Sequence, residues 1–203
     1  LVAAFRTARA ARRTIAVHCV TRVGLVLALA AWEEVGAEEG DRIEHGSIIP
    51  IEMFAPITAL GLQVVTQPAF VWERGDRYLA EVEPDDRPHL YRCASLLTAG
   101  IGVAGSTDAP FGPDDPWRAI RTAIDRRTST GAPIGIDEAL APERALDAFL
   151  GQLGAPTGPP RRIDVGVPAD LCLLDAPLAA VLAEPAAGRV RATWIGGRVV
   201  HGG

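Results

Sequence analysis

The chain contains no lysine, so all 20 of its basic residues are arginine. This absence excludes a lysine nucleophile, a Schiff-base lysine and a modified lysine that bridges two metal ions. Cysteine is scarce as well. Cys19, Cys93 and Cys172 form no Cys-x-x-Cys pair, so we expect neither a disulfide framework nor a zinc knuckle. Such sparing use of cysteine favours a reducing, cytoplasmic location.

Long apolar runs and an excess of basic charge are also missing. The longest apolar run, residues 23–32, is too short to cross a membrane. The net charge is −5, which does not suit a nucleic-acid surface. We therefore expect no membrane partner and no nucleic acid. The 203 residues, with 48% hydrophobic and 22% charged content, are typical of a folded globular protein.

The chain does have a strand–helix alternation, repeated four times between its start and residue 108. Such alternation with short linkers predicts a parallel sheet with right-handed crossovers. A Gly/Pro-rich linker at 151–162 then leads to short strands that include a Gly-Gly hairpin. The expected helices are 1–13, 22–36, 50–61, 88–99, 114–127 and 142–152, the expected strands are 14–18, 42–45, 62–67, 101–108, 170–175 and 190–200, and 68–87 is expected to be a long loop.

Three polar residues close strands of this pattern: His18, His45 and Asp108. The carboxyl ends of barrel strands meet at one mouth, where active sites lie, so we expect these three side chains to converge. Imidazole and carboxylate are hard to bury unless they bind a metal or transfer protons. Taken singly, each has a plainer interpretation, a core histidine bonded to a carbonyl or a turn aspartate. Together they favour a metal site.

Side-chain alternation along strands makes this expectation more specific. If the three candidates point into a barrel, Ala16, Ile43, Ala104 and Ser106 point inward with them, whereas Arg42 and Glu44 point outward to the helices. Cys19 would face away from the mouth and serve packing. The 68–87 loop, with Trp72, Arg74, Arg77 and Tyr78, is either a substrate contact or a solvated surface.

Four segments in this order resemble the amidohydrolase superfamily, and in particular amidohydrolase family 3. They are Ile15-Ala-Val-His18, Arg42-Ile-Glu-His45, Gly105-Ser-Thr-Asp-Ala-Pro110 and the tail Gly166-Val-Pro-Ala-Asp-Leu-Cys-Leu-Leu-Asp175. The resemblance implies that His18 and His45 end the fifth and sixth barrel strands as metal ligands. It implies that Asp108 ends the eighth strand, binds metal and carries the proton.

The implied fold is α/β, the C-terminal half of a (β/α)8 (TIM-type) barrel plus short strands of a small C-terminal β-sandwich subdomain. Residues 1–152 would form the partial barrel, and 153–203 the linker and C-terminal strands. The family also carries a His-x-His pair after its first strand, which this chain lacks, and a complete barrel needs about 250 residues. The resemblance therefore implies a C-terminal portion with at most three of four or five ligands, inactive in isolation.

The function expected from these residues is metal-dependent hydrolysis of non-peptide, amide-like carbon–nitrogen bonds in a small-molecule substrate. A divalent metal, with zinc the first choice and one or two ions, activates water. Asp108 accepts its proton, and His45 binds the metal or polarises the carbonyl. Two alternatives stay open: a non-catalytic half-barrel for assembly or binding, and a related metal-dependent deaminase or lactone hydrolase. Homo-oligomer formation is also left open.

Overall fold

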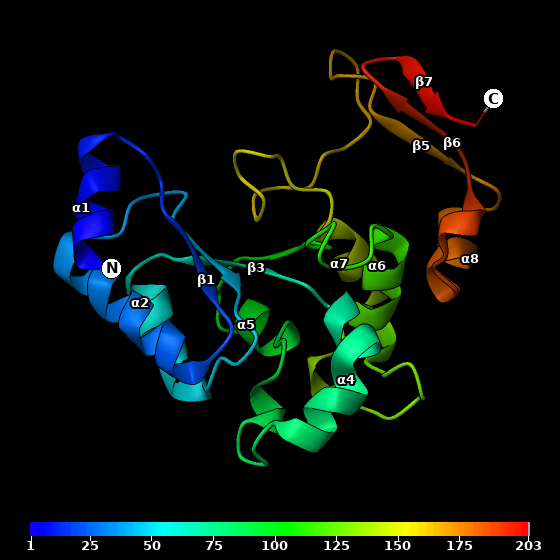
Figure 1. The fold of residues 1–203 in the computed structure, drawn as a ribbon. Helices are drawn as coiled ribbons and strands as arrows, with labels where there is room; N and C mark the ends of the chain where they lie inside the picture. The colour runs from blue at the N-terminus through cyan, green and yellow to red at the C-terminus, as the bar shows by residue number, and fades with distance from the viewer. Residues whose placement is uncertain (203) are drawn as a thin grey trace.

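A computed structural model of the chain describes residues 1–202. Its first sheet has four parallel strands in the order β1-β2-β3-β4 (Figure 1). Each strand pairs with the next one along the chain, and a helical crossover joins each pair, which confirms the predicted α/β alternation. The strands are β1 (Ala16–Cys19), β2 (Arg42–His45), β3 (Gln63–Thr66) and β4 (Val103–Gly105).

The helix α2 (Arg22–Val35) shows how the sequence sets an element. The side chain of Thr21 caps it by accepting a hydrogen bond from the Gly24 N–H at 3.0 Å. Leu25, Leu29 and Trp32 lie on one stripe, and all three are buried, as their spacing predicts.

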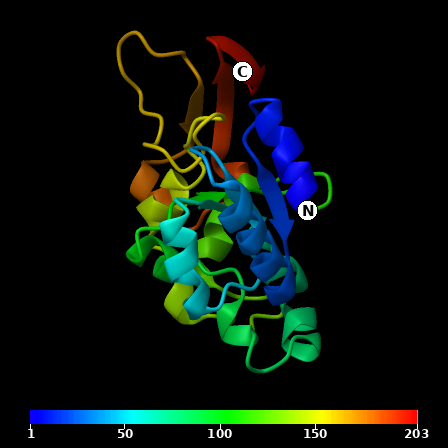
Figure 2. The same ribbon diagram turned by 90° about the vertical axis from the view of Figure 1, so that its left-hand side faces the viewer.

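Helices cover one face of the parallel sheet. Phe5, Leu25, Ile57 and Leu96, each from a different helix, pack in one core with the strand residues Ile43, Val64 and Val103. The other face is open at β1, where Ala16 and His18 are exposed. The covering helices are α1 (Val2–Ala10), α2, α3 (Phe54–Ala59) and α5 (Ala94–Thr98), and α1 lies against α2 in Figures 1 and 2.

The prediction of a long loop over 68–87 is wrong, because most of this segment forms the helix α4 (Ala69–Glu81). The run from Glu73 to Arg77 alternates in charge and contains Gly75, which hides the apolar spacing. Gly75 belongs to the buried face, since a Cβ there would lie 2.5 Å from Thr128 Cγ2. The glycine therefore serves close packing of α4 rather than a turn.

The expected helix 88–99 is also shorter than predicted. Residues Arg87–His89 form a 3-10 turn, Leu90 is extended, and α5 starts only at Ala94. By contrast, α6 (Pro116–Asp125) begins within two residues of the predicted start at 114, because the Asp115 side chain accepts from the Trp117 N–H at 2.9 Å. The remaining helices are α7 (Pro142–Asp147) and α8 (Leu178–Ala183), of which α8 has no counterpart in the prediction.

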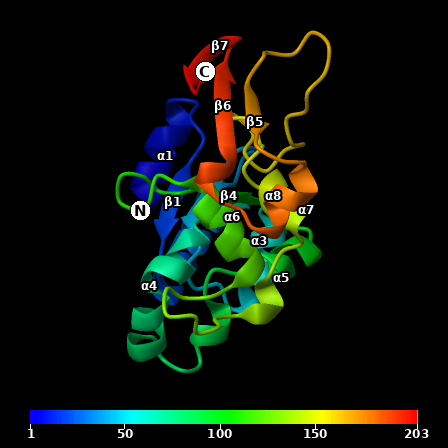
Figure 3. The same ribbon diagram turned by 90° about the vertical axis from the view of Figure 1, so that its right-hand side faces the viewer.

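The C-terminal strands form a separate antiparallel sheet, as predicted. It contains β5 (Leu171–Leu174), β6 (Val190–Ile195) and β7 (Arg198–His201), and Gly196 and Gly197 turn the hairpin with φ of 55° and 78°. The sheet stands apart from β1–β4 and reaches the barrel portion through α8, which packs on α7 (Figures 1 and 3). The division at residue 152 stays a prediction. None of the helices within residues 1–202 is both long and apolar enough to span a bilayer.

Candidate functional site

Two of the three predicted ligands lie in contact. The imidazole rings of His18 and His45 meet edge to face, with centroids 4.4 Å apart and planes at 74°. They come from neighbouring parallel strands, near the carboxyl ends. His18 is exposed, whereas His45 is only 7% exposed. The pair therefore has one open side, where a ligand can reach it.

The route by which His45 reaches His18 differs from the prediction. Strand pairing sets His18 beside Glu44 and Cys19 beside His45, so strict alternation would place the two histidines on opposite faces. The backbone of His45 is left-handed, with φ of 70°, and this conformation re-aims the side chain. A left-handed residue other than glycine costs about 1 kcal/mol or more, and such residues cluster at functional sites.

The inward–outward prediction for β2 is consequently wrong. Ile43 is fully buried in the helix-side core, and Arg42 and Glu44 lie on the face that carries His18. Arg42 Nε pairs with Glu44 Oε1 at 2.5 Å on that face. The prediction failed because it counted alternation backward from His45, whose own backbone breaks the alternation.

Gln67, one residue past β3, orients His45. Its Oε1 lies 2.7 Å from His45 Nδ1, and its Nε2 donates to the Val65 carbonyl at 3.4 Å. Because the amide oxygen can only accept, Nδ1 is the donor, and in the neutral ring Nε2 is then the nitrogen with the lone pair. Histidines that bind metals are typically held in this way. In the sequence, Gln67 looked like a strand terminus, and its only signal was its position at the same edge as the histidines.

Asp108 lies on the turn after β4. It is half-buried, its φ is 57°, its N–H donates to Ser106 Oγ at 3.2 Å, and its carbonyl accepts from the Gly112 N–H at 2.9 Å. Within residues 1–202, no three His, Cys, Asp or Glu side chains are close enough together to hold a metal ion. The structure thus brings the two histidines together but does not add Asp108 to them in one ligand group. Two adjacent imidazoles, one with its free nitrogen fixed by Gln67, still fit a divalent metal.

Cys19 faces the helix side of the sheet, as predicted. It is buried in the core, and burial raises the pKa of its thiol to about 11. A thiol protonated at neutral pH is a poor nucleophile. Cys19 is therefore a packing residue.

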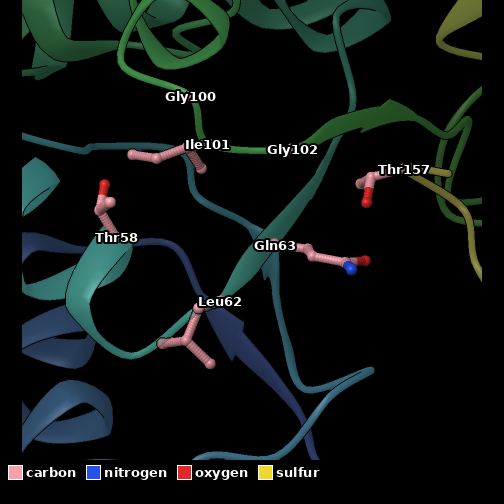
Figure 4. A pocket seen from close by; sticks show the side chains of 8 residues that line it. Thr58, Leu62, Gln63, Gly100, Ile101, Gly102 and Thr157 are labelled. Atoms are coloured by element: carbon pink, nitrogen blue, oxygen red, sulfur yellow. The ribbon is translucent and has the colours of Figure 1, made fainter.

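A cavity of about 230 Å³ lies at the opposite end of the strands (Figure 4). Gln63, at the start of β3, and Thr157, in the linker, project toward it. It has no ionisable side chain in its lining, so it offers no acid, base or metal ligand. Its lining residues are Thr58, Gly61, Leu62, Gln63, Gly100, Ile101, Gly102 and Thr157.

Parallel strands with helices on one face and imidazoles at their carboxyl ends define part of a (β/α)8 barrel, with the imidazoles where such barrels carry their active sites. The sequence profile of the amidohydrolase family matches residues 1–201, and the chain belongs to that family. An N-substituted formamide deformylase of Arthrobacter pascens is 28% identical over 140 residues, which are 66% of this chain and 26% of that protein. The putative amidohydrolase YtcJ of Bacillus subtilis is 27% identical over 126 residues, 61% of this chain and 24% of that protein.

Solved structures agree with this assignment. Metal-dependent hydrolases of Pyrococcus furiosus and Pyrococcus horikoshii superpose with TM-scores of 0.62 and 0.65 at 27% and 26% identity. Each match covers 73% of this chain and 30% of the other. The chain thus spans about a quarter of the length of the curated relatives that it matches.

Proposed function

We propose that the protein is a metal-dependent hydrolase that cleaves amide-like, non-peptide carbon–nitrogen bonds of small molecules. The observation that carries this proposal is the His18–His45 pair, oriented by Gln67 at the carboxyl ends of the strands. The formamide deformylase relative supports the choice of an amide-like bond. N-substituted formamides are therefore the first substrates to test.

His18, His45 and Asp108 would hold the divalent metal, and imidazole with carboxylate suits zinc. When bound, such a metal lowers the pKa of a coordinated water toward about 7 and polarises a carbonyl. The protein's own part would be to present His45 Nε2 to the metal, which the Gln67 contact at Nδ1 supports, and to supply the Asp108 carboxylate for proton transfer. In this proposal the Asp108 carboxylate takes a proton from the attacking water and returns it to the departing nitrogen.

The remaining ligands would come from the rest of a longer protein, of which this chain forms the C-terminal portion. The quarter-length match to both curated relatives supports this part of the proposal. So does the open face of β1, which exposes His18 where further strands of a barrel would lie.

The test uses the whole protein that carries this chain, freed of metal with a chelator and titrated with zinc. We expect zinc to restore hydrolysis of N-substituted formamides. Asp108→Asn should lower kcat by at least about 100-fold, as loss of a general base does, with little change in thermal unfolding. The matched control is Asp114→Asn, an aspartate of the same loop, which should keep full activity.

Other outcomes would overturn the proposal. Full activity of Asp108→Asn would remove Asp108 from catalysis. Activity confined to lactones or amino-heterocycles would favour the related hydrolase or deaminase. A protein that binds no zinc and hydrolyses none of these substrates would favour the non-catalytic half-barrel.

A further inference from the structure

A line of aromatic side chains runs from the histidine pair to the surface. The Phe70 ring lies nearly parallel to His45, with centroids 6.5 Å apart and planes at 12°. Phe111 then meets Phe70 edge to face at 6.1 Å and 88°. Phe70 is buried, whereas Phe111 is 67% exposed. The line therefore ends in an open aromatic ring beside the candidate site.

Arg74 of α4 fixes this exposed ring. Its guanidinium carbon lies 4.3 Å from the Phe70 ring centroid and 4.2 Å from that of Phe111, so the cation contacts both aromatic rings. Its Nη2 also donates to the Phe111 carbonyl at 3.3 Å. Phe111 is thus held through both its ring and its backbone, and one face of the ring is covered.

The turn that carries Phe111 also carries Asp108. The Gly112 N–H closes this turn onto the Asp108 carbonyl. A Cβ at Gly112 would lie 2.1 Å from the Thr107 carbonyl oxygen and 2.8 Å from Phe70 Cε1, so only glycine fits there. The position of Phe111 relative to Asp108 is therefore fixed by close packing.

We propose that the uncovered face of Phe111 is a binding subsite for a flat apolar group, an aromatic ring, attached to the nitrogen or carbonyl carbon of the scissile bond. This inference rests on the proposed function for the identity of that bond. A preordered ring gains stacking and apolar contact without first losing side-chain freedom. A single exposed phenylalanine is not evidence of a binding site by itself. Phe111 is assigned this role because Arg74 holds its ring and its backbone, and because Phe70 connects it to His45.

Arg74 is not a carboxylate site in this arrangement. Its guanidinium lies against two rings, one nitrogen is engaged by the Phe111 carbonyl, and Glu73 lies 3.9 Å away with the opposite charge. The surface offered to a ligand is therefore apolar, which favours an uncharged aromatic group over an anionic one.

The experiment compares three formamides with the whole zinc-loaded protein: N-(2-phenylethyl), N-(2-cyclohexylethyl) and N-methyl. Phe111→Ala should lower kcat/KM for the phenylethyl substrate about five- to tenfold, mainly through KM, and leave the methyl substrate within about twofold. Relative to Phe111→Ala, Phe111→Leu should recover kcat/KM for the cyclohexyl substrate more than for the phenyl one. Leu153→Ala, which removes an exposed apolar side chain elsewhere, is the control and should change nothing.

Binding of 2-phenylethylamine and methylamine, measured by calorimetry, needs no turnover and separates the two proposals. Suppose that Phe111→Ala impairs hydrolysis of all three formamides equally, or of none. Either result would overturn the subsite proposal and leave the proposed hydrolase function standing. If no formamide is hydrolysed but Phe111→Ala weakens phenylethylamine binding at least fivefold, the proposed hydrolase function is overturned and the subsite proposal stands. Thermal unfolding of each variant shows whether the turn has kept its fold.

Discussion

Asp41 pins the two strands that carry the histidines, and its replacement by asparagine is the sharpest test of the fold. It is fully buried and directly precedes β2. Its Oδ1 accepts from the Ile15 N–H at 2.8 Å, just before β1, and its Oδ2 accepts from Trp32 Nε1 at 2.9 Å. Arg9 and the Glu38 N–H bind the same carboxylate. One carboxylate therefore sets the start of both strands and the register that brings His18 to His45.

An asparagine in place of Asp41 would present an NH2 group to donors that need an acceptor. Whichever way the amide is turned, at least two of these hydrogen bonds are lost, and Arg9, whose side chain is only 12% exposed, loses its charge partner. Breaking a buried pair from one side costs about 3–5 kcal/mol. We therefore expect Asp41→Asn to lower the free energy of unfolding by about 4 kcal/mol at pH 7, the middle of that range.

The pH dependence has a definite sign. Burial opposes ionisation of Asp41, but the Arg9 bond and the Ile15 and Glu38 N–H groups outweigh it and hold its pKa below the usual range. Its contribution is therefore complete above the unfolded value of about 3.9 and is lost as the pH falls through the lower folded value. The difference between wild type and Asp41→Asn should shrink in acid, because a protonated aspartate resembles asparagine.

Urea unfolding followed by circular dichroism, at pH 7 and at successively lower pH, measures both effects. The matched control is Glu34→Gln, which removes a carboxylate whose partner Arg6 is exposed, and should cost less than about 1 kcal/mol. A loss below about 1 kcal/mol for Asp41→Asn, or a difference from wild type that grows in acid, would refute the assignment of Asp41 as the strand pin.

Two further predictions concern the site and its surroundings. Gln67→Leu should weaken zinc binding about 10- to 100-fold by freeing the His45 ring. Gln63→Leu, at the other end of β3, should leave the zinc affinity unchanged. A chelator competition that gives Gln67→Leu and wild type equal zinc affinities would contradict the role of Gln67. Gly105→Ala should lower the free energy of unfolding by about 1–3 kcal/mol, because its Cβ would lie 2.2 Å from Phe149 Cε2. Gly154→Ala, where a Cβ meets open space, should leave thermal unfolding unchanged. An unchanged thermal unfolding of Gly105→Ala would show that the Phe149 ring moves freely.

The sequence predicts best those features that depend on local chemistry. Thr21 caps α2 directly before its predicted start, and Asp115 caps α6 within two residues of its predicted start, since a side-chain oxygen satisfies the first N–H groups of a helix in any fold. The strand order also follows from alternation and short linkers. The helix α4 was missed because its buried face contains Gly75, whose suitability depends on Thr128 packing against it. That contact joins distant segments, and no local pattern reports it.

The sequence predicts that His18 and His45 meet, and they do, but the geometry of the contact differs from the prediction because of the backbone at His45. His45 and Asp108 are both left-handed, at φ of 70° and 57°. The His45 side chain therefore departs from the alternation of β2, and Asp108 lies beyond the end of β4, on the turn rather than on the predicted strand. Gly46, itself left-handed, lets the chain turn beneath Ile49 directly after His45, where a Cβ would lie 2.7 Å from Ile49 Cδ1. Gln67 then holds the ring from the neighbouring strand. Packing that exists only in the folded sheet offsets the cost of these left-handed residues. For that reason His45, which alternation would direct away from His18, lies against His18 instead.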